Sequence, residues 1–306
     1  MSDPTSDPLL AATMMLQKSL EKQTALLEDL LQEAKNQGEM TARIQAEATL
    51  ARQIQESTRR VVAAPLLARI RETIVPRQLG FMETLQAIKQ ENLSFARFGD
   101  GEFRLMTRPE FNLSFQKSSH PLRLALRSAV QAEGAPSLLV GFPTILPDMH
   151  WTTVYHEVWD QIEPLIDRVV RFGTTHVSRP IMFQIFGEDA VLAWRSLWDG
   201  KNATIVTGHG SRFDLEPALF DNLASHNFEY SMARDAFTDI ERLVNKLAES
   251  DADVILVSLG PTGSVLVHML SQLGRQALDV GHLSSSFNNV LRGGEFPEDI
   301  PVRRQK

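Results

Sequence analysis

Residues 252–274, ADVILVSLGPTGSVLVHMLSQLG, carry the clearest fold signal in the chain. The stretch starts with a short apolar run, typical of a buried strand, which ends in the glycine-rich turn Gly260-Pro261-Thr262-Gly263. From Ser264 to Leu273 the apolar residues recur at helical spacing, so we expect a helix there. A buried strand that passes through a tight turn into a helix is the repeating unit of α/β folds.

The same alternation extends along most of the chain. We expect further strands at LSFARFG (93–99), SLLVGF (137–142), ATIVTG (203–208) and ALDVGHL (277–283). Helices are expected at 81–92, 122–131, 154–169, 190–198 and 240–248. Uninterrupted apolar runs are typical of parallel strands that are covered on both faces. The predicted fold class is therefore α/β, with a Rossmann-like, mostly parallel sheet and helices on both faces.

A long helix is predicted ahead of this sheet. Residues 9–62 contain no proline and one glycine, and their first half has a heptad seam that includes Leu16, Leu20, Leu27 and Leu30. The seam continues with small and polar residues, so two roles stay open: a coiled coil that makes a homo-oligomer, or a helix folded back on the body. We divide the chain into a helical segment (1–62), a connector (63–79), the sheet domain (80–288) and a loop-like tail (289–306). Pro65 and Pro76 bracket a short helix in the connector.

The composition excludes several classes of protein. The formal net charge of −7 argues against binding to nucleic acid through its phosphates. The chain has no cysteine, which excludes disulfides and cysteine-ligated zinc. No segment reaches the roughly 18 continuous apolar residues of a transmembrane helix, and the N-terminus lacks a secretory pattern, so we expect a cytoplasmic protein. The HExxH, GxSxG and GxGxxG motifs of zinc proteases, serine hydrolases and dinucleotide-binding enzymes are also missing.

Candidate functional residues follow the strands, because ligands of open parallel sheets bind beyond the carboxyl ends of the strands. The strand at 93–99 leads into Gly99-Asp100-Gly101-Glu102. In a tight turn, two carboxylates at this spacing can converge on one hard cation such as Mn²⁺ or Mg²⁺. The alternative is a surface turn whose acids have unrelated roles.

Two more strands end in glycine-rich turns, at 208–212 (Gly-His-Gly-Ser-Arg) and at 260–263. A glycine-rich turn before a helix offers free amides and a favourable dipole to a phosphate, although a simple helix start has the same features. The last predicted strand supplies Asp279 and His282 near its end, and Arg179 lies in HVSRP (176–180). Together these turns favour a nucleotide-binding face.

Four blocks resemble a known family: SFARFGDGEF (94–103), HVSRP (176–180), SLGPTGSVLVHMLSQLG (258–274) and QALDVGH (276–282). In this order they look like the glycosyltransferases of the GT-D fold type, over residues 81–288. The resemblance implies a metal-dependent enzyme that moves a sugar from a nucleotide-sugar, typically a UDP-sugar, to a glycan or glycoprotein acceptor in bacterial surface glycosylation. It also implies Mn²⁺ or Mg²⁺ at Asp100 and Glu102.

The predicted site combines the turns and the resemblance. The candidate catalytic residues are Asp100, Glu102 and His282, and Asp100 and Glu102 are also the candidate metal ligands. Asp235 and Asp239 are additional candidates for a base, together with Asp279 and His282. The candidate substrate-binding residues are Arg97, Gly99, Gly101, Arg179, Gly208, Ser211, Gly260, Thr262 and Asp279.

The chain departs from the family at two places where the family usually carries an acid. Thr207 precedes the glycine of one turn, and Leu283 and three serines follow His282. Two alternatives therefore stay open. One is a catalytically degenerate, nucleotide-binding scaffold tethered by a coiled coil, and the other is an enzyme that acts on a sugar phosphate without a nucleotide.

Overall fold

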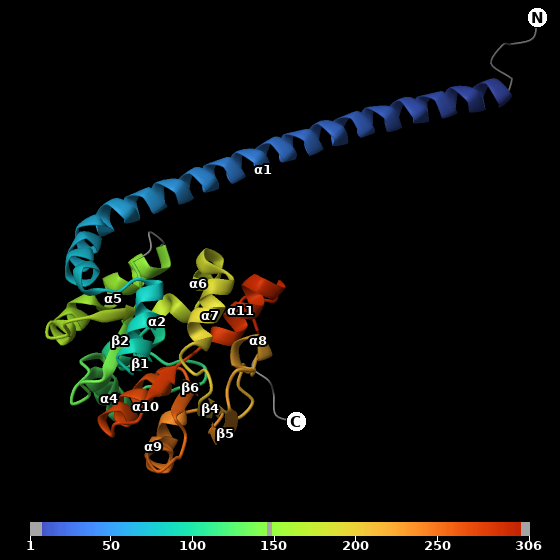
Figure 1. Ribbon diagram of the computed structural model, residues 1–306. Helices are drawn as coiled ribbons and strands as arrows, with labels where there is room; N and C mark the ends of the chain where they lie inside the picture. Colours follow the sequence, from blue (N-terminus) through green and yellow to red (C-terminus); the bar gives the residue numbers. More distant parts are fainter. Residues whose placement is uncertain (1–7, 146–148, 301–306) are drawn as a thin grey trace, which may run out of the picture. The chain divides into compact units, whose positions relative to one another are not determined.

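The computed structural model describes residues 8–145 and 149–300 (Figure 1). The chain divides into two units, Met1–Val62 and Ala63–Lys306. No helix in the described ranges is both long enough and apolar enough to span a membrane.

Helix α1 (Pro8–Ile74) is the expected long N-terminal helix. It includes Pro65, so the break predicted there, and the separate short helix after it, were wrong. Proline removes one backbone hydrogen bond from a helix, but the turns after Pro65 are held by packing, because Ile70 and Ile74 are fully buried in a hydrophobic core. The 3₁₀ helix η1 (Val75–Arg77) follows α1.

Seven strands form one sheet in which every pairing is parallel, and this confirms the predicted α/β class. The order is β3-β2-β1-β7-β6-β4-β5. The bounds are β1 Ser94–Arg97, β2 Leu138–Phe142, β3 Phe172–Thr174, β4 Asn202–Gly208, β5 Ser225–Ser231, β6 Val254–Ser258 and β7 Ala277–Asp279.

Helices cover both faces of the sheet (Figure 1). One core contains side chains of α3 (Asp100–Thr107), α4 (His120–Val130), α5 (Met149–Ile166), α9 (Ile240–Ala248) and α10 (Pro261–Gln272). The other contains side chains of α2 (Phe81–Gln90), α6 (Pro180–Phe186), α7 (Glu188–Arg195), α8 (Pro217–Phe220) and α11 (Leu283–Arg292). The 3₁₀ helices η2 (Thr175–Ser178) and η3 (Ala236–Asp239) complete the fold.

The central strands are mostly apolar because each of their two faces meets a helix layer. In β6, Val254 and Leu256 belong to the core under α11, whereas Ile255 and Val257 belong to the core under α10. This arrangement follows from the alternation of side chains along a strand.

Two strands, β3 and β5, and four α-helices, α3, α6, α8 and α11, were not predicted. The stretch 99–102, expected as a turn, is instead the cap and first turn of α3. The tail expected from residue 289 begins as helix, because α11 continues to Arg292.

The order of the sheet reverses between β1 and β7: from β1 the chain continues to β2 on one side, and β7 lies on the other. Such a reversal opens a crevice at the carboxyl ends of the two strands.

Candidate active site at the ends of β1 and β7

An ion pair joins the two strands at this crevice. Arg97 is the last residue of β1 and Asp279 the last of β7. The Arg97 Nη2 atom lies 3.1 Å from Asp279 Oδ1, and Nη1 donates to Ser178 Oγ at 2.7 Å. The exposed fractions of the Arg97 and Asp279 side chains are 11% and 2%. Burial raises the pKa of Asp279, and the Arg97 guanidinium opposes that shift.

The backbone around Arg97 is shaped to hold its side chain. Gly281 has φ +46°, and a Cβ atom at this position would overlap the Arg97 guanidinium. Ser264 Oγ donates to the Arg97 carbonyl oxygen at 2.6 Å and so ties the end of β1 to α10. Glycine at 281 is therefore required by both its conformation and the close approach of the guanidinium.

Two histidines next to this pair are neutral. Removal from water lowers the pKa of His282 to about 3, and the charges of Arg179, Arg97 and Arg212 act in the same direction. Burial, with Arg179 and Arg97, lowers the pKa of His176 to about 4. The Nδ1 atom of His176 accepts the Thr144 backbone N–H at 3.1 Å. Three guanidinium groups thus act on one neutral imidazole, an electropositive setting that suits an anionic ligand.

The C-terminal segment lies across two of these arginines. Arg179 Nη2 donates to Glu298 Oε1 at 2.5 Å, and its guanidinium carbon lies 5.8 Å from the centre of the Phe296 ring. Arg212 Nη1 donates to the carbonyl oxygen of Pro297 at 3.3 Å.

Asp100 and Glu102 occupy the first turn of α3 but have different environments. Glu102 Oε2 accepts the Gly99 backbone N–H at 2.8 Å, so this side chain caps the helix. Removal of its carboxyl from water raises the pKa of Glu102 to about 7. Asp100 is more open: 42% of its side chain is exposed, and Oδ2 lies 3.2 Å from Arg104 Nη1 and 3.6 Å from His150 Nε2.

These surroundings test whether the two acids fit a divalent cation. No group of three or more His, Asp or Glu side chains in the described residues is arranged to hold a metal ion. Mg²⁺ is often held by only one or two carboxylates, with phosphates and water as its other ligands. Asp100 fits that arrangement through an accessible carboxylate. In Glu102 the Gly99 amide already occupies Oε2, so this side chain would offer a cation only its other oxygen.

The other predicted positions lie in the turns after β4 and β6. Ser211 Oγ lies 2.6 Å from Thr207 Oγ1, in the turn that Gly208 begins. Gly260 has φ +55° and is covered by the ring of Phe115, from the loop after α3. Thr262 is buried and donates to Gln116 Oε1 at 3.0 Å. This loop therefore covers the N-terminus of α10. Gly101 packs against Leu113 of the same loop.

The two additional candidates for a base make local contacts. Asp235 Oδ1 accepts the Lys117 backbone N–H at 2.7 Å. Asp239 pairs with Arg242 at 2.6 Å, and the hydrogen bond from that guanidinium lowers the pKa of Asp239.

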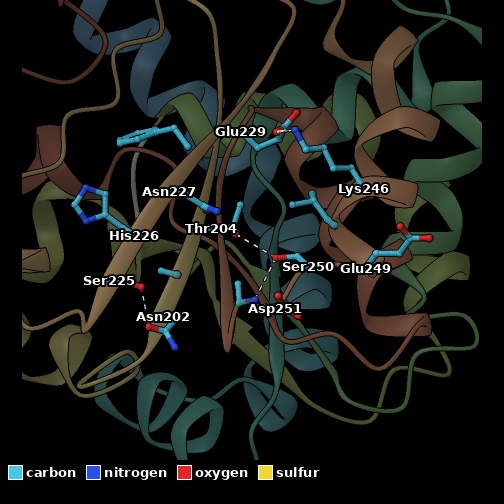
Figure 2. Close-up of a pocket in the computed structure, with 14 residues that line it drawn as sticks. Asn202, Thr204, Ser225, His226, Asn227, Glu229, Lys246, Glu249, Ser250 and Asp251 are labelled. Carbon is cyan, nitrogen blue, oxygen red and sulfur yellow. Dashed lines mark hydrogen bonds and ion pairs between the residues drawn. The ribbon is translucent and has the colours of Figure 1, made fainter.

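A groove of about 490 Å³ lies elsewhere, between α9 and the amino ends of β4 and β5 (Figure 2). Two polar contacts lie within its lining: Lys246 is 2.5 Å from Glu229, and Ser225 Oγ donates to Asn202 Oδ1 at 2.7 Å. Because ligands of parallel sheets bind at the carboxyl ends of strands, we place the candidate site at β1 and β7 rather than in this groove.

Three residues that contact the arginines at the ends of β1 and β7, or are one of them, were not predicted from the sequence: Ser178, Arg212 and Glu298. Ser178 and Arg212 lie inside motifs that had been singled out, HVSRP and the turn at 208–212, but Arg179 and Ser211 were chosen there. Glu298 fell in the predicted tail, and no local pattern marks it as a partner of an arginine 119 residues away.

Comparison with known proteins identifies relatives of this chain. The family model for the glycosyltransferase GT-D fold matches residues 95–304. "Glycosyltransferase GlyD" of Streptococcus pneumoniae is 29% identical over 231 residues, which cover 71% of this chain and 28% of that protein. "Probable glycosyl transferase Gly" of Streptococcus gordonii is 29% identical over 225 residues, or 68% of this chain and 32% of that protein. The chain thus spans less than a third of the length of these two relatives.

Solved structures agree with this match. The highly conserved domain of unknown function 1792, described as having a distinct glycosyltransferase fold, superposes with a TM-score of 0.68 at 27% identity. The match covers 76% of this chain and 87% of that one. A structure described as a new glycosyltransferase from Streptococcus sanguinis gives a TM-score of 0.59 at 25% identity and covers 71% of this chain and 85% of that one.

Proposed function

This chain belongs to the glycosyltransferase GT-D fold family. We propose that it transfers a sugar from a nucleotide-sugar, preferentially a UDP-sugar, to a glycan or glycoprotein acceptor. The observation that carries the proposal is the cluster at the ends of β1 and β7. There, Arg97, Arg179 and Arg212 all act on His282. A diphosphate is the part of such a donor that this positive charge would bind.

Departure of the nucleoside diphosphate is the step in which these arginines act. When the bond between the sugar and the diphosphate breaks, negative charge grows on the leaving oxygen. Arg97 is held rigidly by Asp279 and Ser178, so its guanidinium needs little reorganisation to stabilise that charge. Arg179 would bind the same diphosphate from η2 and α6.

Asp100 is the residue that we propose for a divalent cation, Mn²⁺ or Mg²⁺. Such a cation would neutralise part of the charge on the diphosphate. Glu102 would act mainly through the helix cap, which fixes the start of α3 and hence the position of Asp100 two residues earlier.

His282 is the base that we propose for the acceptor hydroxyl. In this structure its pKa of about 3 makes it a weak base. A bound diphosphate would offset the charges of the surrounding arginines, and the pKa of the imidazole would then rise. On this proposal, donor binding makes His282 a stronger base than it is in the free protein, while removal of the imidazole from water, the largest cause of its low pKa, persists.

The N-terminal helix supports a second proposal, that the protein self-associates as a coiled coil. In the seam of residues 9–62, the side chains of Leu20, Leu27 and Leu30 are 65%, 64% and 54% exposed. A heptad seam of leucines that is exposed in a single chain is the surface that a parallel or antiparallel coiled coil buries. A homo-oligomer would join several catalytic domains through their N-terminal helices.

Donor turnover tests the proposed activity. The full chain is incubated with Mn²⁺ and, in separate reactions, UDP-, GDP-, CMP- and dTDP-sugars, and release of the nucleotide is measured. Turnover of one nucleotide-sugar class supports the transferase. Binding of a nucleotide with no release or transfer would favour the scaffold alternative. Turnover of simple sugar phosphates only would favour a sugar-phosphate enzyme.

A further inference from the structure

Segment 296–298 brings acceptor atoms to two arginines of the candidate site. The Glu298 carboxylate lies 2.5 Å from Arg179, and the Pro297 carbonyl oxygen lies 3.3 Å from Arg212. Pro297 is buried, whereas 49% of the Glu298 side chain is exposed. The segment is therefore anchored at Pro297, and the acid beside it is accessible to water.

The positive charge at this place is only partly neutralised. Arg97 is paired with Asp279 and Arg179 with Glu298. For Arg212, the described residues provide no ion pair, and its buried Nε atom has no hydrogen-bond partner in that part of the chain. An N–H of a guanidinium without a protein partner is a donor that an anion can satisfy.

The contacts of segment 296–298 resemble those of an anionic ligand. A carboxylate oxygen meets one guanidinium and a carbonyl oxygen meets the other, at two arginines that both act on His282. A phosphate group offers more oxygens and more charge than this combination, so it is a stronger partner for a guanidinium. The half-exposed ion pair of Glu298 is of the kind that contributes little net stability, so a phosphate can displace it.

We propose that Arg179 and Arg212 form a subsite for a phosphate group beside His282, and that Glu298 occupies the Arg179 half of this subsite until a phosphate displaces it. The identity of that phosphate as part of a nucleotide-sugar rests on the proposed function. The competition between carboxylate and phosphate does not, and inorganic pyrophosphate is sufficient to test it.

Calorimetric titration of the full chain with inorganic pyrophosphate provides the test. Glu298→Gln removes the competing charge at an accessible position, so we expect pyrophosphate to bind about two- to fivefold more tightly, the equivalent of one exposed ion pair. The matched control is Glu295→Gln, an exposed acid three residues earlier, which should leave the affinity unchanged. Arg212→Gln should weaken binding at least about tenfold, as loss of a charge-assisted contact does.

Two results would overturn the proposed competition between Glu298 and phosphate. One is equal affinity of the wild type, Glu298→Gln and Glu295→Gln; the other is no detectable binding of pyrophosphate to any of them. The Glu298 comparison does not depend on Arg212→Gln, which could fail to fold. Unfolding curves of every variant identify such a failure.

Titration with UDP separates this inference from the proposed function. If Glu298→Gln tightens pyrophosphate binding but UDP binds no better than pyrophosphate, the subsite stands and the nucleotide-sugar proposal fails. If UDP binds tightly and Glu298→Gln changes the affinity for neither probe, the transferase proposal stands and the role of Glu298 is wrong.

Discussion

Arg97 Nη2 and Asp279 Oδ1 lie 3.1 Å apart, although the two residues are separated by 182 positions in the chain. The pair exists because the sheet places β7 beside β1. Both side chains are mostly buried, so the ion pair is shielded from solvent and rigid, and removal of one partner would leave a costly unpaired charge. The pair fixes the position of the Arg97 guanidinium, and Ser178, Gly281 and His282 lie close to that group.

The first prediction concerns the space beside Arg97. Gly281→Ala should destabilise the protein by about 2–5 kcal/mol, because it combines a strained positive φ with overlap of the Arg97 guanidinium. Gly274→Ala is the control: its φ of +75° is equally unsuitable, but no atom lies within 4 Å of the new Cβ. That variant should lose only about 1–2 kcal/mol. Urea unfolding measures both, and equal losses would show that Arg97 is not held at Gly281.

A second prediction separates Asp100 from Glu102. Glutamine at position 102 retains an oxygen that can accept the Gly99 N–H, so Glu102→Gln should keep both the stability and Mn²⁺-dependent UDP binding. Glu102→Ala should lose about 1 kcal/mol of unfolding free energy with the cap. Thermal unfolding and calorimetry report the two effects. Loss of Mn²⁺-dependent binding in a stable Glu102→Gln variant would make Glu102 a metal ligand instead.

The third prediction is a pH dependence of stability due to His176. Its pKa is about 4 in the folded protein, against 6.5 for a free histidine. Between these values the unfolded chain takes up a proton that the folded chain does not, so stability is lost as the pH falls from about 6.5 to about 4. The full loss corresponds to roughly 3 kcal/mol.

His176→Asn isolates this contribution, since asparagine can still accept the Thr144 N–H but does not titrate. Unfolding free energies of both proteins are measured between pH 7 and pH 4. Other titrating groups are shared and cancel in the difference, so the wild type should lose more stability on acidification. Parallel curves would mean that His176 is protonated without cost in the fold.

The fourth prediction tests self-association. Leu27→Glu places a charge in the heptad seam, whereas Leu26→Glu introduces the same charge at an equally exposed position outside it; the two leucines are 64% and 61% exposed. We expect the mass in solution to fall to that of a monomer for Leu27→Glu only. Light scattering at several concentrations measures this. A monomeric wild type, or the same mass for both variants, would remove the coiled coil.

The sheet was predictable from the sequence where its strands are central. Strands such as β4 and β6 are buried on both faces, so they stand out as apolar runs bounded by turns. Strand β5, SHNFEYS, is an edge strand with mostly exposed side chains and carries no such run. Strand β3 has only three residues, too few for any periodic signal.

Helices α3 and α11 were missed for a different reason. The first turn of α3 contains glycine, and α11 begins with three serines and two asparagines among its first seven residues, all poor helix formers. Other contacts compensate: Glu102 caps its own helix through the Gly99 N–H, and a tertiary hydrogen bond from Ser286 Oγ of α11 to the Ser178 carbonyl oxygen, at 3.0 Å, holds α11. Local propensity does not contain these interactions.

Individual residues of the candidate site could be predicted from the sequence, but their arrangement in space could not. Arg97, Asp100, Asp279 and His282 each stood out by position at or just after the end of a strand, but their mutual arrangement depends on the order of the sheet. Whether Asp100 and Glu102 converge depends on α3, which sequence patterns did not predict. The contact between Glu298 and Arg179 depends on the course of the C-terminal segment, which has no periodic pattern.

The measurement that tests the central claim most directly is calorimetric titration of UDP, with and without Mn²⁺, against the wild type and Asp100→Asn. The proposed donor site predicts binding to the wild type that is strengthened by Mn²⁺, and loss of that strengthening in Asp100→Asn with the weaker, metal-independent binding to the arginine cluster retained. Absence of UDP binding to the wild type, or an equal effect of Mn²⁺ on both proteins, would contradict a metal-assisted nucleotide-sugar site at the ends of β1 and β7.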